Sequence, residues 1–307
     1  LWHDHFAEEL TLKSTITKFF GERVNQLVAG FEFKFNDYQW IDITRPWIGA
    51  PIQIDENTVS ETYRIGETFD AWHVKPKRGA FFITDKIRYN GLIANIGGRL
   101  EYWAPGRYVD NAVADALDPN TVSTIPTFIA EEYIDKSTDI LGLRYKFRFL
   151  PKVNVSFPVR ENQVLFFNYG HSTRIPHPSY VYAGLDPFYQ DQSDLPDLGN
   201  PNLDPEVDIS YEIGLRNQFT ANDALNVSAF WRDKYDFVTT QSIRVQDVDG
   251  RDVTKAFRIN GDYARARGVE ITYLKRYKDL LRGQLSFTYS RAEGLSSTND
   301  DNLNSIN

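Results

Sequence analysis

Apolar and polar residues alternate along most of this chain. In residues 206–219, the side chains of Ile209, Tyr211, Ile213 and Leu215 share one face, and polar residues separate them. A period of two is that of a β-strand, because successive side chains point to opposite faces. The same pattern predicts ten strands, at residues 7–20, 25–43, 71–89, 92–104, 144–159, 163–175, 206–219, 225–245, 258–277 and 281–292.

Short turns and long loops connect these segments alternately. Asn90-Gly91 separates two of them and is a strong signal for a tight hairpin, whereas residues 105–143 and 176–205 form long loops. The strands are roughly two to three times longer than the five or six residues usual in soluble sheets. Long strands with short turns on one side and long loops on the other are typical of an outer-membrane β-barrel.

Charged residues of both signs lie in mid-strand on one face only. They include Glu32, Lys34, Arg99, Glu101, Glu212, Arg216, Arg232, Lys234, Glu270 and Arg276. In a barrel this face would line an enclosed lumen, while in a soluble sandwich it would face water, and that alternative stays open here. Aromatic residues near the short turns (Phe19, Phe20, Tyr89, Phe157, Phe219, Tyr277) and tryptophans near the loops (Trp40, Trp47, Trp72, Trp103) predict two interfacial girdles.

The composition narrows the class of protein further. The 307 residues contain no Cys, so disulfides and cysteine chemistry are excluded. A net charge of −8 argues against a nucleic-acid partner. We find no apolar run of about 18 residues, which excludes a transmembrane helix but leaves a transmembrane barrel possible.

Several stretches resemble the barrel of TonB-dependent outer-membrane receptors, most of all the Bacteroidota-type branch. They are "RGAFFITDKIRYNGLIANIGGRLEYWAPG" (78–106), "FLPKVNVSFPVRENQVLFFNYGH" (149–171), "GNPNLDPEVDISYEIGLRNQ" (199–218) and "YARARGVEITYLKRY" (263–277). Asn-Pro-x-Leu-x-Pro-Glu ahead of one strand and Arg-Gly-Val-Glu opening another carry the likeness. It covers most of residues 70–292.

The resemblance implies an all-β, antiparallel, up-and-down transmembrane barrel of about 22 strands. Residues 1–307 would be a partial barrel domain of about ten strands, without the plug domain and the closing strands. The implied activity is uptake of a scarce nutrient from outside the cell. The implied partners are outer-membrane lipid, the TonB energy-coupling complex acting through a plug, and a surface lipoprotein or other envelope subunits.

We find no catalytic motif, so we expect no enzyme activity and no cofactor. The cluster His3-Asp4-His5 is a weak metal signal, because no second element supports it, and we expect no metal site. For a transporter, the expected ligand contacts in the lumen are Arg99, Glu101, Arg216 and Arg232, and those near the outer mouth are His171, Arg174, Tyr180 and Tyr182. Hydration of a water-filled interior is the alternative role for each charge.

Two other functions remain possible at this point. A complete ten-stranded outer-membrane enzyme could place His171 beside Asp186 or Asp191 at the rim of a small closed barrel. A barrel subunit could instead anchor an envelope assembly and transport nothing.

Overall fold

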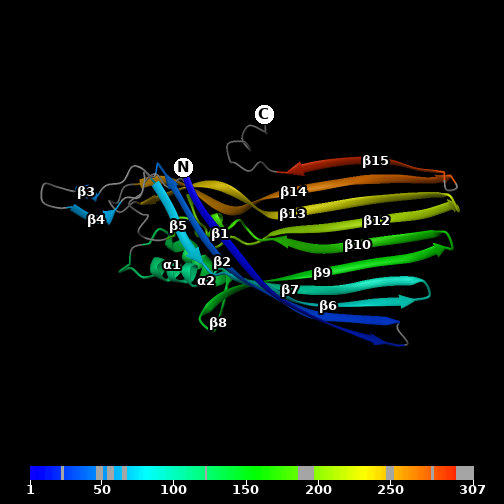
Figure 1. Ribbon diagram of the computed structural model, residues 1–307, viewed down its shortest axis with the longest axis horizontal. Coiled ribbons are helices and arrows are strands. Elements are labelled where there is room, and N and C mark those ends of the chain that lie inside the picture. The colour runs from blue at the N-terminus through cyan, green and yellow to red at the C-terminus, as the bar shows by residue number, and fades with distance from the viewer. Residues whose placement is uncertain are drawn as a thin grey trace.

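The computed structural model places most of the chain in one large, twisted sheet (Figure 1). It describes residues 1–21, 24–45, 51–53, 59–63, 68–121, 123–185, 197–246, 252–277 and 280–294. Thirteen strands of this described part belong to the large sheet, and two form a separate hairpin.

Ten long strands form the wall, and each pairs antiparallel with the next along the chain. They are β1 (Trp2–Phe20), β2 (Asn25–Thr44), β6 (Lys77–Tyr89), β7 (Leu92–Ala104), β9 (Leu143–Arg160), β10 (Gln163–Arg174), β12 (Glu206–Thr220), β13 (Asp223–Gln246), β14 (Asp252–Tyr277) and β15 (Leu281–Gly294). The described part of the sheet is open, with β1 and β15 at its edges. The prediction of ten up-and-down strands of a partial barrel is confirmed.

Shorter elements gather at one end of the wall. They are β3 (Pro51–Gln53), β4 (Val59–Tyr63), β5 (Thr68–Val74), α1 (Arg107–Leu117), α2 (Thr127–Lys136), β8 (Thr138–Ile140), α3 (Pro178–Tyr182) and β11 (Asp197–Leu198). We refer to this end as the loop end and to the opposite end as the turn end (Figure 1). At the turn end, Asn90 and Gly91 both have positive φ, at 49° and 82°. These are the dihedrals that a tight two-residue hairpin requires, so the Asn-Gly prediction is confirmed.

The two faces of the wall differ in chemistry, as the alternation predicts. One row on the outward face crosses six strands through directly paired residues, and all of its members are apolar. It runs Phe157, Leu165, Leu215, Val227, Ile271 and Phe287. The neighbouring row on the inward face runs Ser156, Phe166, Gly214, Ser228, Glu270 and Thr288. A slip of one residue in any strand would exchange its two faces.

One predicted strand, residues 71–89, is interrupted. The structure divides it into β5 and β6, with Lys75 and Pro76 between them. Proline has no N–H to donate to a sheet ladder, so the pairing breaks there. Both pieces still pair with β2, β5 along its loop-end half and β6 along its turn-end half. The wall therefore keeps its order across the break.

The loop predicted at residues 105–143 contains two helices that pack inside the loop end. On α1, Val109, Ala112 and Val113 are buried at helical spacing, and on α2, Ile129 and Tyr133 are buried. They belong to one cluster with residues of the wall, of α3 and of the segment before β12, including Trp72, Trp103, Val181 and Leu203. The long loops therefore build a small apolar core within the mouth of the wall.

This core corrects the prediction of a tryptophan girdle at the loop end. Trp72 and Trp103 are only 4% and 5% exposed, because they point inward and pack in the mouth core. Trp40 stacks on Trp72 from the same side, with 5.5 Å between the rings, and Trp47 lies outside the described residues. At the turn end, in contrast, the predicted aromatics are all exposed: Phe19, Phe20, Tyr89, Phe157, Phe219 and Tyr277.

Glycines in the wall make room for aromatic rings from the paired strand. A Cβ on Gly30 would lie 2.6 Å from the ring of Phe82, and one on Gly214 would lie 2.3 Å from the ring of Phe166. Each ring lies on the residue directly opposite its glycine in the register. The glycine removes a side chain, and the ring across the ladder covers the exposed backbone.

We expect Gly214→Ala to lower the yield of folded protein, because the new methyl group would overlap Phe166 and approach the carbonyl of Val227. Overpacking of this kind costs about 1–3 kcal/mol. The measurement is the heat-dependent shift in electrophoretic mobility of the membrane-extracted protein. Gly170→Ala is the matched control, because a Cβ there would meet its nearest atom at an ordinary 3.9 Å. Equal folding of the two variants would contradict the prediction.

Candidate functional site

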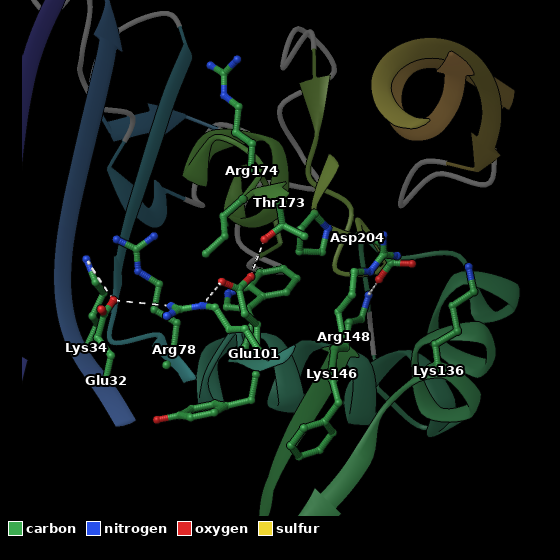
Figure 2. A pocket seen from close by; sticks show the side chains of 17 residues that line it. Glu32, Lys34, Arg78, Glu101, Lys136, Lys146, Arg148, Thr173, Arg174 and Asp204 are labelled. Carbon is green, nitrogen blue, oxygen red and sulfur yellow. Dashed lines mark hydrogen bonds and ion pairs between the residues drawn. The ribbon is translucent and has the colours of Figure 1, made fainter. Parts of the chain in front are cut away.

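A cavity of about 610 Å³ opens on the inward face of the wall, beside the mouth core (Figure 2). Adjacent strands supply most of its charged groups at alternate positions. Its lining includes Glu32, Lys34, Arg78, Arg99, Glu101, Lys136, Lys146, Arg148, Thr173, Arg174 and Asp204. Positive and negative groups are interleaved, so the cavity offers hydrogen-bond donors and acceptors at short range to a polar ligand.

The carboxylates of the cavity already have cationic partners. The guanidinium of Arg99 donates to Glu101 at 2.7 Å and lies 3.7 Å from Glu32. The ammonium of Lys34 lies 2.7 Å from Glu9, which also accepts from Arg78. Except for Glu32, which is 16% exposed, these groups are a quarter to a third exposed, so a ligand can reach them. A ligand that enters would therefore exchange partners with existing ion pairs rather than meet isolated charges.

Three of the eight predicted contact residues line this cavity. Arg99 and Glu101 lie at its wall, and Glu101 also accepts a hydrogen bond from the hydroxyl of Thr173. Arg174 ends β10 at the rim, and in Figure 2 its side chain points away from the other labelled groups. At Arg99, Glu101 and Arg174, residues that the alternation places on the inward face therefore line the cavity.

The two predicted tyrosines of the mouth belong to α3. The hydroxyl of Tyr182 donates to the carbonyl of Pro105 at 3.0 Å, and the residue is buried in the mouth core. The ring of Tyr180 lies under the guanidinium of Arg258 at 4.9 Å. Both rings thus hold α3 against neighbouring segments of the mouth.

The other three predicted contacts lie away from the cavity. His171 lies on the outward face, where its Nε2 atom is 2.7 Å from the hydroxyl oxygen of Tyr169. Arg216 packs over the ring of Phe166 at 4.9 Å, towards the turn end. Arg232 on β13 lies 3.4 Å from Asp208 on β12, and both residues are on the inward face. The structure does not bring these residues together with Arg99.

Lys146 and Arg148 also line the cavity, and neither is among the contacts predicted from the sequence. Their signal is present in the sequence, because they continue the polar face of β9 that begins at Ser156 and Asn154. Leu150 is an apolar residue at one of these inward-facing positions, so it interrupts the polar pattern and makes the pattern hard to recognise. Two basic residues separated by one position mark this face.

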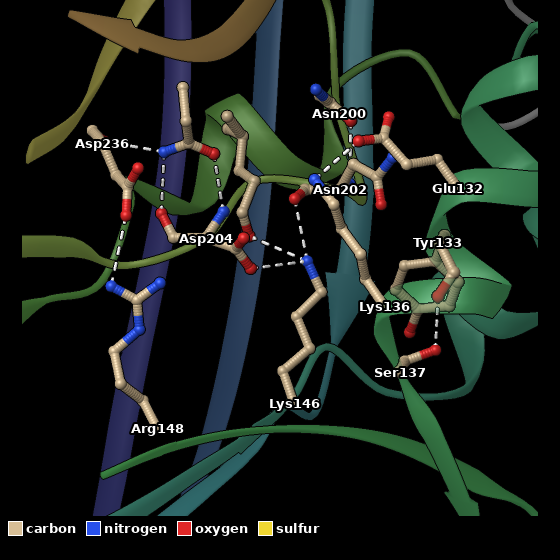
Figure 3. A network of polar contacts seen from close by, with 12 residues as sticks. Glu132, Tyr133, Lys136, Ser137, Lys146, Arg148, Asn200, Asn202, Asp204 and Asp236 are labelled. Carbon is tan, nitrogen blue, oxygen red and sulfur yellow. Dashed lines mark hydrogen bonds and ion pairs between the residues drawn. The ribbon is translucent and has the colours of Figure 1, made fainter.

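Lys146 anchors the polar network beneath the mouth core (Figure 3). Its ammonium donates to the carbonyls of Asn202 and Leu203, at 2.8 and 3.3 Å, and lies 3.1 Å from a carboxylate oxygen of Asp204. The residue is only 7% exposed. A buried ammonium is tolerated only where its hydrogen bonds are satisfied, and here the chain between α3 and β12 satisfies them.

The segment at residues 200–205 is tied to four other elements at once. The side chain of Asn200 donates to the carbonyl of Arg258 at 2.7 Å, and its backbone N–H donates to Tyr180 at 2.8 Å. The side chain of Asn202 donates to the carbonyl of Ile129 at 3.3 Å. This segment therefore joins α2, α3, β9 and β14, which explains why an Asn-Pro-Asn sequence precedes β12.

We expect Lys146→Met to loosen the mouth core, because it leaves the carbonyls of Asn202 and Leu203 without their donor. Leaving buried acceptors unsatisfied costs about 1–3 kcal/mol. The measurement is amide hydrogen exchange of residues 198–205. Lys136→Met is the control, because Lys136 is exposed and makes an i,i+4 pair with Glu132, worth a few tenths of a kcal/mol. Equal exchange in both variants would contradict the role of Lys146.

A buried carboxyl group on β5 connects the wall to α3. Asp70 accepts hydrogen bonds from the backbone N–H of Gly184 at 3.2 Å and from the indole N–H of Trp72 at 3.1 Å. Burial raises the pKa of Asp70 to about 6, although both hydrogen bonds lower it and the charge of Asp42 raises it. The carboxyl group therefore changes charge close to neutral pH.

We expect the stability of the region around Asp70 and α3 to fall as pH rises from about 4 to about 6, because the buried carboxyl group then loses its proton in the folded state. Because the pKa in the folded state is raised to about 6, stability is fully present below the unfolded pKa and is lost as pH rises through about 6. The measurement is hydrogen exchange of residues 180–185, corrected for intrinsic rates. Asp70→Asn should remove this pH dependence, and an unchanged dependence in the variant would contradict the assignment.

Comparisons with known proteins agree with this architecture. The family model described as "TonB dependent receptor-like, beta-barrel" matches residues 2–307. A comparison with curated protein sequences finds no match. Among the described residues, no helix has the length and apolar character needed to cross a membrane.

Solved structures share the fold over nearly the whole chain. The outer membrane transporter YddB from Escherichia coli aligns with a TM-score of 0.61 at 10% identity, covering 95% of this chain and 34% of that one. The FrpB iron transporter from Neisseria meningitidis aligns with a TM-score of 0.56 at 13% identity, covering 96% and 38%. The hemophore receptor HasR from Serratia marcescens, in complex with its hemophore HasA and heme, aligns with a TM-score of 0.54 at 15% identity, covering 94% and 42%. The chain thus spans about a third of the first structure's length.

Proposed function

The chain belongs to the TonB-dependent receptor-like β-barrel family, and from this premise we propose that it is part of a receptor that imports a scarce nutrient with TonB-coupled energy. It lies in the bacterial outer membrane. The apolar row through Leu165 faces lipid there, and the long loops are extracellular.

One observation supports import more than any other: the charged cavity lies on the inward face, next to the extracellular mouth. A nutrient that arrives from outside would meet this cavity before it reached the rest of the lumen. Interleaved guanidinium, ammonium and carboxylate groups favour a polar ligand that carries both donors and acceptors. We therefore assign ligand contacts first to Arg99, Glu101 and Arg174.

The other five predicted contacts have different proposed roles. We assign Arg216 and Arg232 to the hydrated lumen, where their charge would act on a ligand in passage. Tyr180 and Tyr182 would hold the mouth in shape through α3. His171 lies on the outward face and would contact lipid rather than ligand.

The enzyme alternative has less support. It requires a small closed barrel, and the described strands form an open sheet with edges at β1 and β15. Its proposed acids, Asp186 and Asp191, lie outside the described residues. The family and the structural neighbours are receptors and transporters, not enzymes.

We expect Arg99→Ala and Glu101→Ala each to reduce uptake about tenfold or more, because each removes a charged contact in a partly desolvated cavity. The nutrient is first identified as the growth source that a gene deletion strain can no longer use, and its uptake is then measured with a labelled form. Arg160→Ala is the matched control, because Arg160 is exposed at the turn end of β9. Equal uptake in all variants at equal surface abundance would contradict the site.

We expect deletion of the host's TonB protein to abolish uptake while leaving binding of the labelled nutrient to whole cells unchanged. Energy coupling would act on passage and not on the external site. Uptake that continues without TonB would contradict energy-coupled import while leaving the binding site in place.

A further inference from the structure

Two histidines and one aspartate meet on paired strands at the mouth of the wall. His3 and His5 lie two positions apart on β1, and Asp42 on β2 is directly opposite His3 in the register. One ligand atom from each side chain lies within 4.8 Å of the other two. The Nε2 atom of His5 is 2.6 Å from a carboxylate oxygen of Asp42, and the Nδ1 atom of His3 contacts the same oxygen. Both imidazoles thus converge on one oxygen atom.

The cluster lies on the inward face of the wall. On β1 it shares its face with Glu9, and on β2 it shares its face with Lys34, without any shift in the register between them. Glu9 and Lys34 form an ion pair at 2.7 Å, and Lys34 lines the cavity. Asp42 lies eight positions after Lys34, so the cluster is about 26 Å further along the strand, towards the extracellular end.

Trp40 holds two of the three side chains in place. Its indole N–H donates to Oδ2 of Asp42 at 2.7 Å, so the Oδ1 atom is left to face both imidazoles. The ring of His5 stacks on the same indole, with centroids 3.4 Å apart and an interplanar angle of 17°. Trp40 itself stacks on the buried Trp72 at 5.5 Å. Outer partners of this kind orient the ligands of a metal site before the metal arrives.

We propose that His3, His5 and Asp42 bind a divalent transition-metal ion at the extracellular mouth. Two imidazole nitrogens and one carboxylate oxygen are donors that suit Zn²⁺, Ni²⁺ and Cu²⁺. Three protein ligands leave at least one coordination position open to water or to a donor from outside. Metal binding here goes beyond the proposed import and does not depend on it, because it is measured on the purified receptor.

A second histidine–aspartate pair shows what a simple hydrogen bond looks like in the same region. The Nε2 atom of His73 lies 2.5 Å from Asp37, and Lys75 lies 2.9 Å from the other oxygen of that carboxylate. Only one imidazole is present, and a lysine neutralises the aspartate. This pair lacks the second nitrogen that a metal site needs, and it therefore serves as the matched control.

The test uses the full-length protein, purified in detergent and stripped with a chelator. Copper(II) chloride is titrated into it, and binding is followed by calorimetry and by electron paramagnetic resonance. We expect one bound Cu²⁺ whose spectrum shows coupling to two imidazole nitrogens. His3→Gln, His5→Gln and Asp42→Asn should each weaken the affinity about tenfold or more, while His73→Gln should leave both the affinity and the spectrum unchanged.

A fourth variant separates a built site from adventitious binding. Trp40→Phe keeps an aromatic ring but removes the hydrogen bond to Asp42, and we expect about a tenfold loss of affinity with the two-nitrogen spectrum retained. A spectrum with fewer than two nitrogens in the parent protein would overturn the proposal. Equal affinity in the parent, His3→Gln and His5→Gln proteins would also overturn it.

Discussion

The wall depends on one constraint: in lipid, the backbone N–H and C=O groups of a strand must be satisfied by neighbouring strands. The unbroken register from Trp2 to Phe20 against β2 is one expression of it. Pairing of this kind fixes which side chains meet lipid and which meet the lumen. Chemistry can therefore be placed on the inward face only at every second position, and this explains why Arg99 and Glu101 flank an outward-facing Leu100.

The long loops add what the wall alone lacks, which is a packed apolar core beside the cavity. Lys146 reaches from β9 into the segment before β12, and that segment is bonded to two helices and to β14. The buried ammonium of Lys146 is thus one of the links that join the transmembrane wall to the extracellular core. The charged cavity lies against this junction, so its shape depends on how the loops fold as well as on the strands.

The alternation in the sequence was sufficient to predict the long strands. It did not predict that the loops pack against the inward face to form the mouth core. Residues 92–104 match β7 at both ends, because alternation and the Asn90-Gly91 turn agree there. The inward packing of Trp103 could not be predicted, since alternation assigns two faces but does not show which loops fold over one of them. The helical spacing of Val109, Ala112 and Val113 is a signal for α1 that lies inside a segment predicted as a loop.

The paired glycines and phenylalanines limit how the channel of such a receptor can evolve. Phe82 and Phe166 each occupy the space that a side chain on the facing strand would need. A larger residue at Gly30 or Gly214 would need a smaller opposing ring and also a shift of the backbone, because the carbonyls of Ser14 and Val227 lie 2.4 and 2.8 Å from the respective Cβ positions. We therefore expect the width of the channel to change through paired substitutions on neighbouring strands. A single substitution would rarely be tolerated at these positions.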